Sequence, residues 1–275
     1  ASLTQKEPCI PPPRRDFHKW TLAAAAAAGV PPASMSQTPP APAPLRSRRA
    51  EDIITLKPEL HGTRGLVAGG TQYTVDAGMR MLLAGGNAFD AGVAAVFAAA
   101  MNELTYFGLG GEAPVIVHEA SSGRITVVSG QGTAPKAAKP AHFLAAGVIP
   151  GNGPDAGTVP AVVDSMALTL QNFGTMSLAQ VLEPALRLAE GFPVYGLLRN
   201  AFIIHRNSTM RWEWSRRTYY PGGRIPEVGE IFRQPNLLAT LRAMVEAEKA
   251  ALQKGADRVK AIEAGRDVFY KGEVG

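Results

Sequence analysis

A glycine pair followed by an asparagine, Gly85–Asn87, separates two apolar stretches and constrains the local fold more than any other feature. The stretch before it, Tyr73–Leu83, carries apolar residues at roughly helical spacing. Because glycine readily adopts the left-handed conformation that ends a helix, the pair predicts a helix end. Asn87 predicts the cap of a second helix over Ala88–Met101. That helix is rich in alanine and contains Gly92, so its small side chains let another backbone approach closely. This pattern predicts burial against a sheet.

Three short apolar segments are bounded by glycine, proline or polar residues, as is typical of strands. Gly65–Ala68 is flanked by glycines and predicts a buried strand. Pro114–His118 and Ile125–Val128 predict two more strands, and the polar Ala120–Gly123 between them indicates a hairpin turn. The second of these strands leads into Ser129–Pro135, where glycines allow the backbone to approach a ligand.

Four further stretches predict helices from their apolar spacing and end residues. They are Val159–Asn172 with Pro160 at an early position, Ser177–Glu190 with Ser177 as its cap, Pro193–Ile204, and Asn236–Ala250. Strand pairs mixed with helices indicate an α+β or layered sandwich fold. The chain has 275 residues, of which 46% are hydrophobic, so it is long enough to bury a sizeable core.

The glycine-rich stretch Tyr106–Gly111 resembles a phosphate-binding loop only in composition. Such a loop binds phosphate where it connects a strand to a helix, because the helix N-terminus then faces the anion. Here the stretch follows a predicted helix and precedes a predicted strand. Nucleotide binding is therefore excluded by context.

The formal net charge of +5 resides in the first fifty residues, which hold seven basic and two acidic side chains. The rest of the chain is formally neutral and lacks the basic surface that binds phosphate backbones, so no nucleic-acid partner is expected. The mixed cationic and aromatic stretch Arg211–Arg217 is accordingly interpreted as a surface patch on a loop.

Residues 1–50 are rich in proline and contain the alanine run Ala23–Ala28, a composition with too few large apolar groups to order a core. We expect a disordered tail there and a folded body over residues 51–275. The longest apolar run, Leu22–Val30, is shorter than the roughly 20 residues that a membrane-spanning helix needs. No stable membrane insertion is expected.

Part of this tail resembles a twin-arginine export signal. Arg14 and Arg15 are followed by Phe17, Lys19 and a weakly apolar run, in the order such signals use. His18 departs from the apolar residue usual at its position, and the alternative is a basic, proline-rich linker. An export signal of this kind predicts a periplasmic or secreted bacterial protein.

No catalytic constellation is complete in the sequence. The five histidines are scattered without metal-ligand spacing, and the single cysteine, Cys9, excludes a site built from several cysteines. No Gly-x-Ser-x-Gly nucleophile elbow is present. The residues therefore predict no metal, no cofactor and no catalytic residue within this chain.

Several motifs together resemble the large-subunit portion of the gamma-glutamyltransferase family. They are Arg64–Gly70, Gly85–Ala91, Gly108–Gly111, Thr133–Pro135, Gly157–Val163, Leu182–Val194, Gly229–Pro235 and Phe269–Glu273. The resemblance implies an N-terminal-nucleophile hydrolase with a four-layer αββα sandwich shared with a small subunit. It also implies a proenzyme that cleaves itself, so that a new N-terminal threonine of the small subunit becomes the nucleophile. The threonine motif has no match here, and we expect the nucleophile outside this chain.

Two departures from the family pattern bear on the substrate. Glu112-Ala113 stands where the family usually carries more glycines, and the second departure lies in the loop before the Ala-Pro pair. In gamma-glutamyl enzymes an Asp-Gly-Arg-Glu loop precedes the Ala-Pro pair, and its arginine binds the substrate α-carboxylate; here the stretch is Ser129–Gly132, with Gln131 in the arginine's place. A neutral amide cannot supply a charge-assisted bidentate pair. We expect Gln131, with Gly130 and Gly132 beside it, to line the substrate pocket. The alternative is that Gln131 faces solvent and Arg124 takes over the role.

These observations lead to three hypotheses for function. The first is the large-subunit part of a self-processing amidohydrolase or acyltransferase that acts on a small amide other than a gamma-glutamyl compound. The second is an ordinary gamma-glutamyltransferase or glutathione hydrolase that binds the carboxylate through another group. The third is a catalytically inactive binding subunit. In the first two, the expected partners are the small subunit from the same proenzyme and a small-molecule amide.

Overall fold

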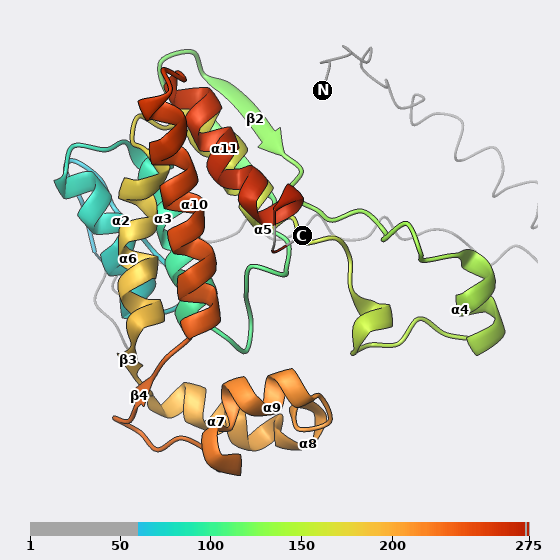
Figure 1. Cartoon of the computed structure of the whole chain (residues 1–275). Coiled ribbons are helices and arrows are strands. Elements are labelled where there is room, and N and C mark those ends of the chain that lie inside the picture. Colours follow the sequence, from blue (N-terminus) through green and yellow to red (C-terminus); the bar gives the residue numbers. More distant parts are fainter. Residues whose placement is uncertain (1–59, 273, 275) are drawn as a thin grey trace, which may run out of the picture. The chain divides into compact units, whose positions relative to one another are not determined.

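The computed structural model describes residues 60–272 and 274, which belong to one compact unit that begins at residue 60 (Figure 1). The predicted tail and its twin-arginine pattern lie outside the described residues. The described part combines helices with two antiparallel strand pairs, so it is mixed α and β as predicted. No helix in that part is long and apolar enough to cross a membrane.

The first two helices form where the glycine pair and asparagine predict them. Helix α2 covers Gln72–Leu83, and α3 covers Ala88–Asn102. Gly85 has φ +89° between them, in the left-handed region. The Asn87 side chain accepts from the N–H groups of Phe89 and Asp90, while the Asp90 side chain accepts from the Asn87 N–H. This reciprocal capping box confirms the predicted start of α3.

Four further helices complete a helical layer around α3. They are α5 (Val162–Phe173), α6 (Leu178–Glu190), α10 (Pro235–Gln253) and α11 (Arg258–Lys271), and α6 and α10 lie side by side in Figure 1. The core between the helices holds mainly aliphatic and methionine side chains, including Phe97, Met101, Met166, Leu170, Leu182, Leu241, Met244 and Ile262. Within the described residues, α3 packs mainly against α2, α5 and α6, so burial of α3 against a sheet stays a prediction for its open face. A surface of alanines accepts another helix as readily as a sheet, and helical periodicity does not distinguish the two.

A β-hairpin follows the glycine-rich loop. Strand β1 (Val115–Glu119) pairs antiparallel with β2 (Arg124–Val128), and Val115 lies opposite Val128 in the register. This confirms the two predicted strands and their turn. Because side chains alternate along a strand, Val117 and Val128 are buried while Ile116, Ile125 and Val127 are exposed.

The segment Gly65–Ala68, predicted to be a strand, forms none in the structure. It runs irregularly along α2 and α3, and among the described residues no strand pairs with it. Val67 packs against the core and would contact a side chain placed at Gly78 of α2. A short apolar run packed on a helix has the same composition as a buried strand.

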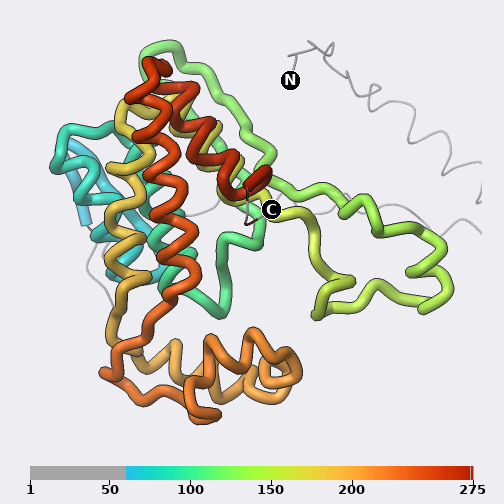
Figure 2. The backbone as a smooth tube through the Cα atoms, in the orientation of Figure 1, coloured from blue at the N-terminus to red at the C-terminus, as the bar shows by residue number. Residues whose placement is uncertain are grey.

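A smaller lobe is inserted between α6 and α10. Figure 2 shows the chain leaving α6 through β3 (Phe192–Pro193) and returning to α10 through β4 (Ile231–Phe232), which pairs with β3. Between these strands lie α7 (Gly196–Ile204), α8 (Arg206–Thr209), α9 (Glu213–Tyr219) and the 3-10 turn Pro221–Gly223. Its core is aromatic, with Phe192, Phe202, Tyr220 and Phe232 in contact.

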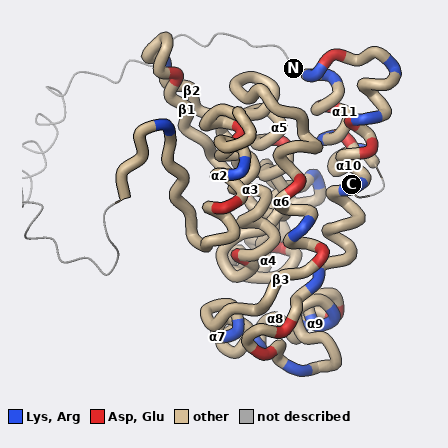
Figure 3. Tube along the Cα trace, turned by 90° about the vertical axis from the view of Figure 1, so that its left-hand side faces the viewer, with Lys and Arg blue, Asp and Glu red and all other residues tan. Residues whose placement is uncertain are grey.

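Two predicted helices begin later than the sequence indicates. Residues 193–195 precede the helix at Gly196 because Phe192–Pro193 pairs with β4, and Pro160 precedes α5, which begins at Val162. Helix α6 is confirmed with Ser177 as its cap. The patch Arg211–Arg217, interpreted as a loop, instead leads into α9, and Arg217 packs over the Trp214 ring there. Acidic and basic residues are interspersed over the described part of the chain (Figure 3).

The hairpin connects to α5 through a long excursion. It contains α4 (Pro140–Ala146) and the 3-10 turn Pro154–Ala156. His142 on α4 contacts Asp155 at 3.0 Å, and α4 itself buries no residue. Residues on either side of this excursion, near 132 and 159, lie next to each other, and the candidate site is located there.

Candidate functional site

The loop after β2 is held against the chain that precedes β1. Gly130 has φ +54°, and its carbonyl oxygen accepts from the Ala113 N–H at 2.9 Å. A Cβ atom at Gly130 would collide with the Ala113 carbonyl, and an L-residue seldom adopts this φ. Gly130 is thus required by both the space and the backbone conformation.

A second contact fixes the loop one residue beyond Gln131. The Gly132 N–H donates to Glu112 Oε1 at 3.1 Å, and the Thr158 hydroxyl donates to the same oxygen at 3.3 Å. The Val159 N–H donates to the Thr133 carbonyl at 2.9 Å, and a Cβ at Gly132 would collide with the Val159 carbonyl. Three segments that are distant in sequence, around residues 112, 132 and 158, are therefore joined at one place.

Gln131 projects from this junction beside a pocket of about 340 Å³. One wall consists of the loop residues Gln131, Gly132 and Thr133, and the opposite wall belongs to helices α5 and α11. The helical wall contributes Asp164, Arg266, Asp267, Tyr270 and Lys271, while Val159, Pro160 and Ala161 lie between the two walls. This volume is in the range of small-molecule pockets.

The two cations of the pocket are already bonded to carboxylates. Arg266 Nη1 lies 3.2 Å from Asp164 Oδ1, and its Nη2 lies 2.7 Å from Asp267 Oδ1. Lys271 Nζ lies 2.9 Å from Asp267 Oδ2. Burial opposes ionisation of Asp267, but hydrogen bonds from Lys271 and Arg266 outweigh it and lower the pKa of this carboxyl. Both cations that line the pocket are therefore already paired with carboxylates.

Tyr270 joins the helical wall to the segment between the walls. Its hydroxyl donates to the Pro160 carbonyl at 2.9 Å and accepts from the Asp164 N–H at 3.0 Å. Burial raises the pKa of this phenol, so it remains protonated and able to donate near neutral pH. The end of α11 and the start of α5 therefore keep a fixed spacing at the pocket.

Each predicted site residue has a clear location. Gln131 is exposed and lines the pocket, while Gly130 and Gly132 hold its loop in place. Arg124, the alternative anchor, lies at the turn end of the hairpin, opposite the end where Gln131 lies, and its Nε is 2.6 Å from Glu119 Oε2. The structure thus gives Arg124 another partner.

Glu112 departs from the family's glycine pattern in the sequence, but its place at the junction of the three segments is not predicted there. A single acid next to glycines is usually a solvated surface group, and nothing in the sequence shows its hydrogen-bond partners. Among the described residues, no group of three or more histidine, cysteine or acidic side chains is arranged to hold a metal ion.

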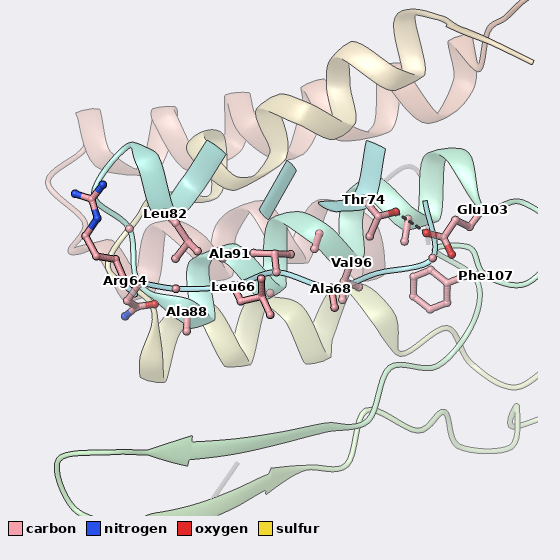
Figure 4. A pocket seen from close by; sticks show the side chains of 18 residues that line it. Arg64, Leu66, Ala68, Thr74, Leu82, Ala88, Ala91, Val96, Glu103 and Phe107 are labelled. Atoms are coloured by element: carbon pink, nitrogen blue, oxygen red, sulfur yellow. Dashed lines mark hydrogen bonds between the residues drawn. The ribbon is translucent and has the colours of Figure 1, made fainter. Parts of the chain in front are cut away.

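A larger hollow of about 670 Å³ lies elsewhere, between the irregular segment 64–70 and helices α2 and α3 (Figure 4). Its lining is mainly apolar, with Leu66, Ala91 and Val96 among the labelled residues. Its one acid, Glu103, accepts from the Thr71 N–H at 3.1 Å and from the Thr74 hydroxyl at 2.5 Å, so it serves the fold. The larger hollow is therefore mainly an apolar surface, and its one acid already has hydrogen-bond partners within the fold.

Comparison with known proteins places this geometry in context. The family model described as Gamma-glutamyltranspeptidase matches residues 74–275. The glutathione hydrolase-like YwrD proenzyme of Bacillus subtilis (strain 168) is 32% identical over 201 residues, which is 70% of this chain and 37% of that protein. The acylase ACY 1 proenzyme of Pseudomonas sp. (strain SE83) is 31% identical over 226 residues, 78% of this chain and 40% of that protein.

A solved structure agrees with these matches. The crystal structure of Helicobacter pylori gamma-glutamyltranspeptidase superposes with a TM-score of 0.69 at 26% identity, covering 79% of this chain and 59% of that one. The chain spans well under half the length of the two curated relatives.

Proposed function

The chain belongs to the gamma-glutamyltranspeptidase family, and on this premise we propose that it is the large-subunit part of a self-processing amidohydrolase or acyltransferase acting on a small amide other than a gamma-glutamyl compound. The two relatives compared above carry the names of a glutathione hydrolase-like proenzyme and an acylase proenzyme. The family therefore includes proteins named for different amide substrates, and the substrate must be argued from the site.

One observation carries the proposal: the residue at the family's carboxylate-anchor position, Gln131, is neutral and lines a pocket whose two cations are both bonded to carboxylates. An α-carboxylate entering here would lose water without gaining a charge-assisted pair, which is unfavourable. An amide carbonyl, a hydroxyl or an amine would instead find a donor and an acceptor on Gln131.

The proposed reaction needs a nucleophile from the part of the protein that this chain does not include. A threonine hydroxyl there would attack the amide carbonyl carbon, with the threonine's own amine taking the proton. The C–N bond then breaks, the amine leaves with that proton, and an acyl ester remains on the threonine. Water or an acceptor amine resolves the ester. The described residues would bind the acyl portion and hold it in place.

The rest of the protein is also the partner that we propose for two apolar surfaces. The outer face of the hairpin exposes Ile116, Ile125 and Val127. The hollow of Figure 4 exposes Leu66 beside the alanine-rich face of α3. Apolar patches of this kind on a folded unit mark interfaces. A sheet completed by the small subunit on these surfaces would give the four-layer αββα sandwich.

The test of function is the rate on gamma-glutamyl-p-nitroanilide, measured on the full-length, self-processed protein. We expect a kcat/KM about 30- to 1000-fold below that of an efficient gamma-glutamyl enzyme, because one buried charge-assisted contact is missing. Gln131→Arg should recover part of this activity and depress activity on the native amide. A kcat/KM above about 10⁵ M⁻¹s⁻¹ for the unmodified protein would favour the glutathione hydrolase alternative. A protein that neither self-cleaves nor hydrolyses amides would instead be a binding subunit.

We propose in addition that the protein is exported to the periplasm, or out of the cell, through the twin-arginine route. The support is the order of Arg14, Arg15, Phe17 and Lys19 before an apolar run. Changing both arginines to lysine should leave the protein in the cytoplasm, as measured by cell fractionation. Undiminished export of the double variant would show that the pattern is only a basic linker.

A further inference from the structure

Glu112 stands at the junction of the three segments that build the candidate site. Its Oε1 accepts from both the Gly132 N–H and the Thr158 hydroxyl, at 3.1 and 3.3 Å. Gly132 follows Gln131 in the sequence. The Glu112 carboxylate therefore binds the backbone immediately next to the residue that we propose contacts the substrate. Its Oε2 accepts no hydrogen bond from the part of the chain that the structure describes.

The position between Gly132 and Thr158 requires a hydrogen-bond acceptor. The Gly132 N–H and the Thr158 hydroxyl are both donors, and a side-chain oxygen between them satisfies both. A Cβ atom at Gly132 would clash with the Val159 carbonyl, so the loop lies close against residues 158 and 159 at this point. Without Glu112, the backbone that carries Gln131 would lose this connection to residue 158.

The charges around the site also favour one kind of substrate. On the helical wall of the pocket, Asp164 and Asp267 pair with the cations Arg266 and Lys271. Glu112 makes no ion pair among the described residues. The charge of Glu112 therefore has no paired cation in the described part of the chain, and a negative charge attracts an amine and repels a carboxylate.

We propose that Glu112 is a positioning and specificity-determining residue: it holds the Gln131 loop through Oε1 and selects amides whose recognised end is neutral or positively charged. This inference rests on the proposed amidohydrolase function and narrows its substrate class. A group that only stabilised the loop would affect all substrates equally, whereas this role makes the effect depend on substrate charge.

The experiment uses four p-nitroanilides that differ by single groups. Gamma-glutamyl carries both an amine and a carboxylate, 4-aminobutyryl keeps only the amine, glutaryl keeps only the carboxylate, and butyryl has neither. With the full-length, self-processed protein, we expect kcat/KM for 4-aminobutyryl to exceed that for glutaryl. Glu112→Gln keeps an acceptor oxygen but removes the charge, and it should reduce this ratio about tenfold, the size expected for one partly screened charge.

Two further variants separate positioning from charge. Glu112→Ala removes the acceptor and should lower kcat/KM on all four probes, and Glu112→Gln should recover most of the loss on the butyryl probe. Glu119→Gln is the matched control, because Glu119 pairs with Arg124 at the turn end of the β1–β2 hairpin, away from the candidate site. It should leave the 4-aminobutyryl to glutaryl ratio unchanged within about twofold, since exposed pairs contribute little.

The outcomes that contradict the proposal are distinct from those that contradict the function. Hydrolysis of the probes with a ratio that Glu112→Gln does not change, or a wild-type preference for glutaryl, would overturn the role of Glu112 and leave the amidohydrolase standing. Failure of the processed wild-type protein to hydrolyse any of the four probes would overturn both.

Discussion

In the helical layer, both oxygens of each buried carboxylate accept hydrogen bonds. On the hairpin side of the molecule, by contrast, large apolar side chains are exposed. Asp90 is fully buried and accepts from the N–H groups of Asn87, Thr175 and Met176 and from the Thr175 hydroxyl, at 2.7 to 3.0 Å. On the hairpin, Ile116 is 77% and Val127 65% exposed. The helical layer thus satisfies its own groups within the described residues, and the hairpin side does not.

Glu248 is a second buried carboxylate of the helical layer whose two oxygens both accept hydrogen bonds. It is 1% exposed on α10, and its two oxygens accept from the N–H groups of Leu178 and Ala179 at 2.6 and 2.7 Å. These are free donors at the start of α6, which a carboxylate satisfies well. The difference between the two regions supports our proposal that the rest of the protein adds contacts on the hairpin and in the hollow beside α3, and not on α6 or α10.

The largest effect is expected from Asp90→Ala in the full-length protein. The change leaves three N–H groups and a hydroxyl without their acceptor and removes a fully buried carboxylate, so the free energy of unfolding should fall by about 3–5 kcal/mol. Denaturant unfolding measures it. Asp76→Ala, at the exposed Asp76–Arg80 pair, is the control and should cost less than about 1 kcal/mol. A small effect of Asp90→Ala would mean that the helical layer is not self-supporting.

The same carboxyl predicts a pH dependence. Burial opposes ionisation of Asp90, but the hydrogen bonds from Met176, Asn87 and Thr175 outweigh it and lower its pKa below the ordinary value of 3.8. A lowered pKa means that the stabilisation is complete above pH 3.8 and is lost as the pH falls through the folded-state pKa. The stability difference between the wild type and Asp90→Asn should therefore shrink in that acid range. A difference that grows with falling pH would contradict the sign.

Val127→Gln tests whether the hairpin is covered in the complete protein. If the small subunit packs on this face, a buried polar group replaces a valine, and unfolding should become easier by about 2–3 kcal/mol. Leu252→Gln on α10, where the side chain is 45% exposed, is the matched control and should change stability by about 0.5 kcal/mol or less. Equal, small effects of both variants would indicate that the hairpin faces solvent.

Gly92→Ala examines the hollow beside α3. A Cβ at Gly92 meets nothing within 4 Å among the described residues, and helix propensity alone would make alanine more stable by about 0.5–1 kcal/mol. Because we propose that the rest of the protein covers this face, we expect instead a loss of about 1 kcal/mol from overpacking. Thermal unfolding of the full-length variant decides the sign, and a gain in stability would show an uncovered α3.

Removal of residues 1–50 should have the smallest effect. Their proline and alanine content offers little apolar surface to pack. The melting temperature of the assembled protein should stay within a few degrees of the original, as measured by calorimetry. A larger drop would assign the tail a structural role in one of the two regions.

Local signals made much of the helical layer predictable. The Asn87 cap, the Ser177 cap and the stripe through Leu241 and Met244 depend on neighbours in sequence, and all three appear in the structure. Helix α11 was missed, because charged residues interrupt its apolar stripe. The helices that pack against α3 were not predicted, because an alanine-rich surface does not identify what covers it.

The candidate site was predictable only in part. Gln131 stands out because its loop departs from a family pattern, and the structure places it on a pocket. The opposite wall, with Asp164 and Arg266, comes from segments more than thirty residues away along the chain. Glu112 gains its role only from partners at 132 and 158, which no local pattern specifies.

The Tyr270 hydroxyl, which bridges Pro160 and Asp164, has a consequence for how this scaffold evolves. It ties one wall of the pocket to the helical core, where most substitutions are costly because the packing is tight. The facing wall consists of loops that tolerate change. We therefore expect substrate preference to change more readily through substitutions near 112 and 131 than through substitutions in the wall on α5 and α11.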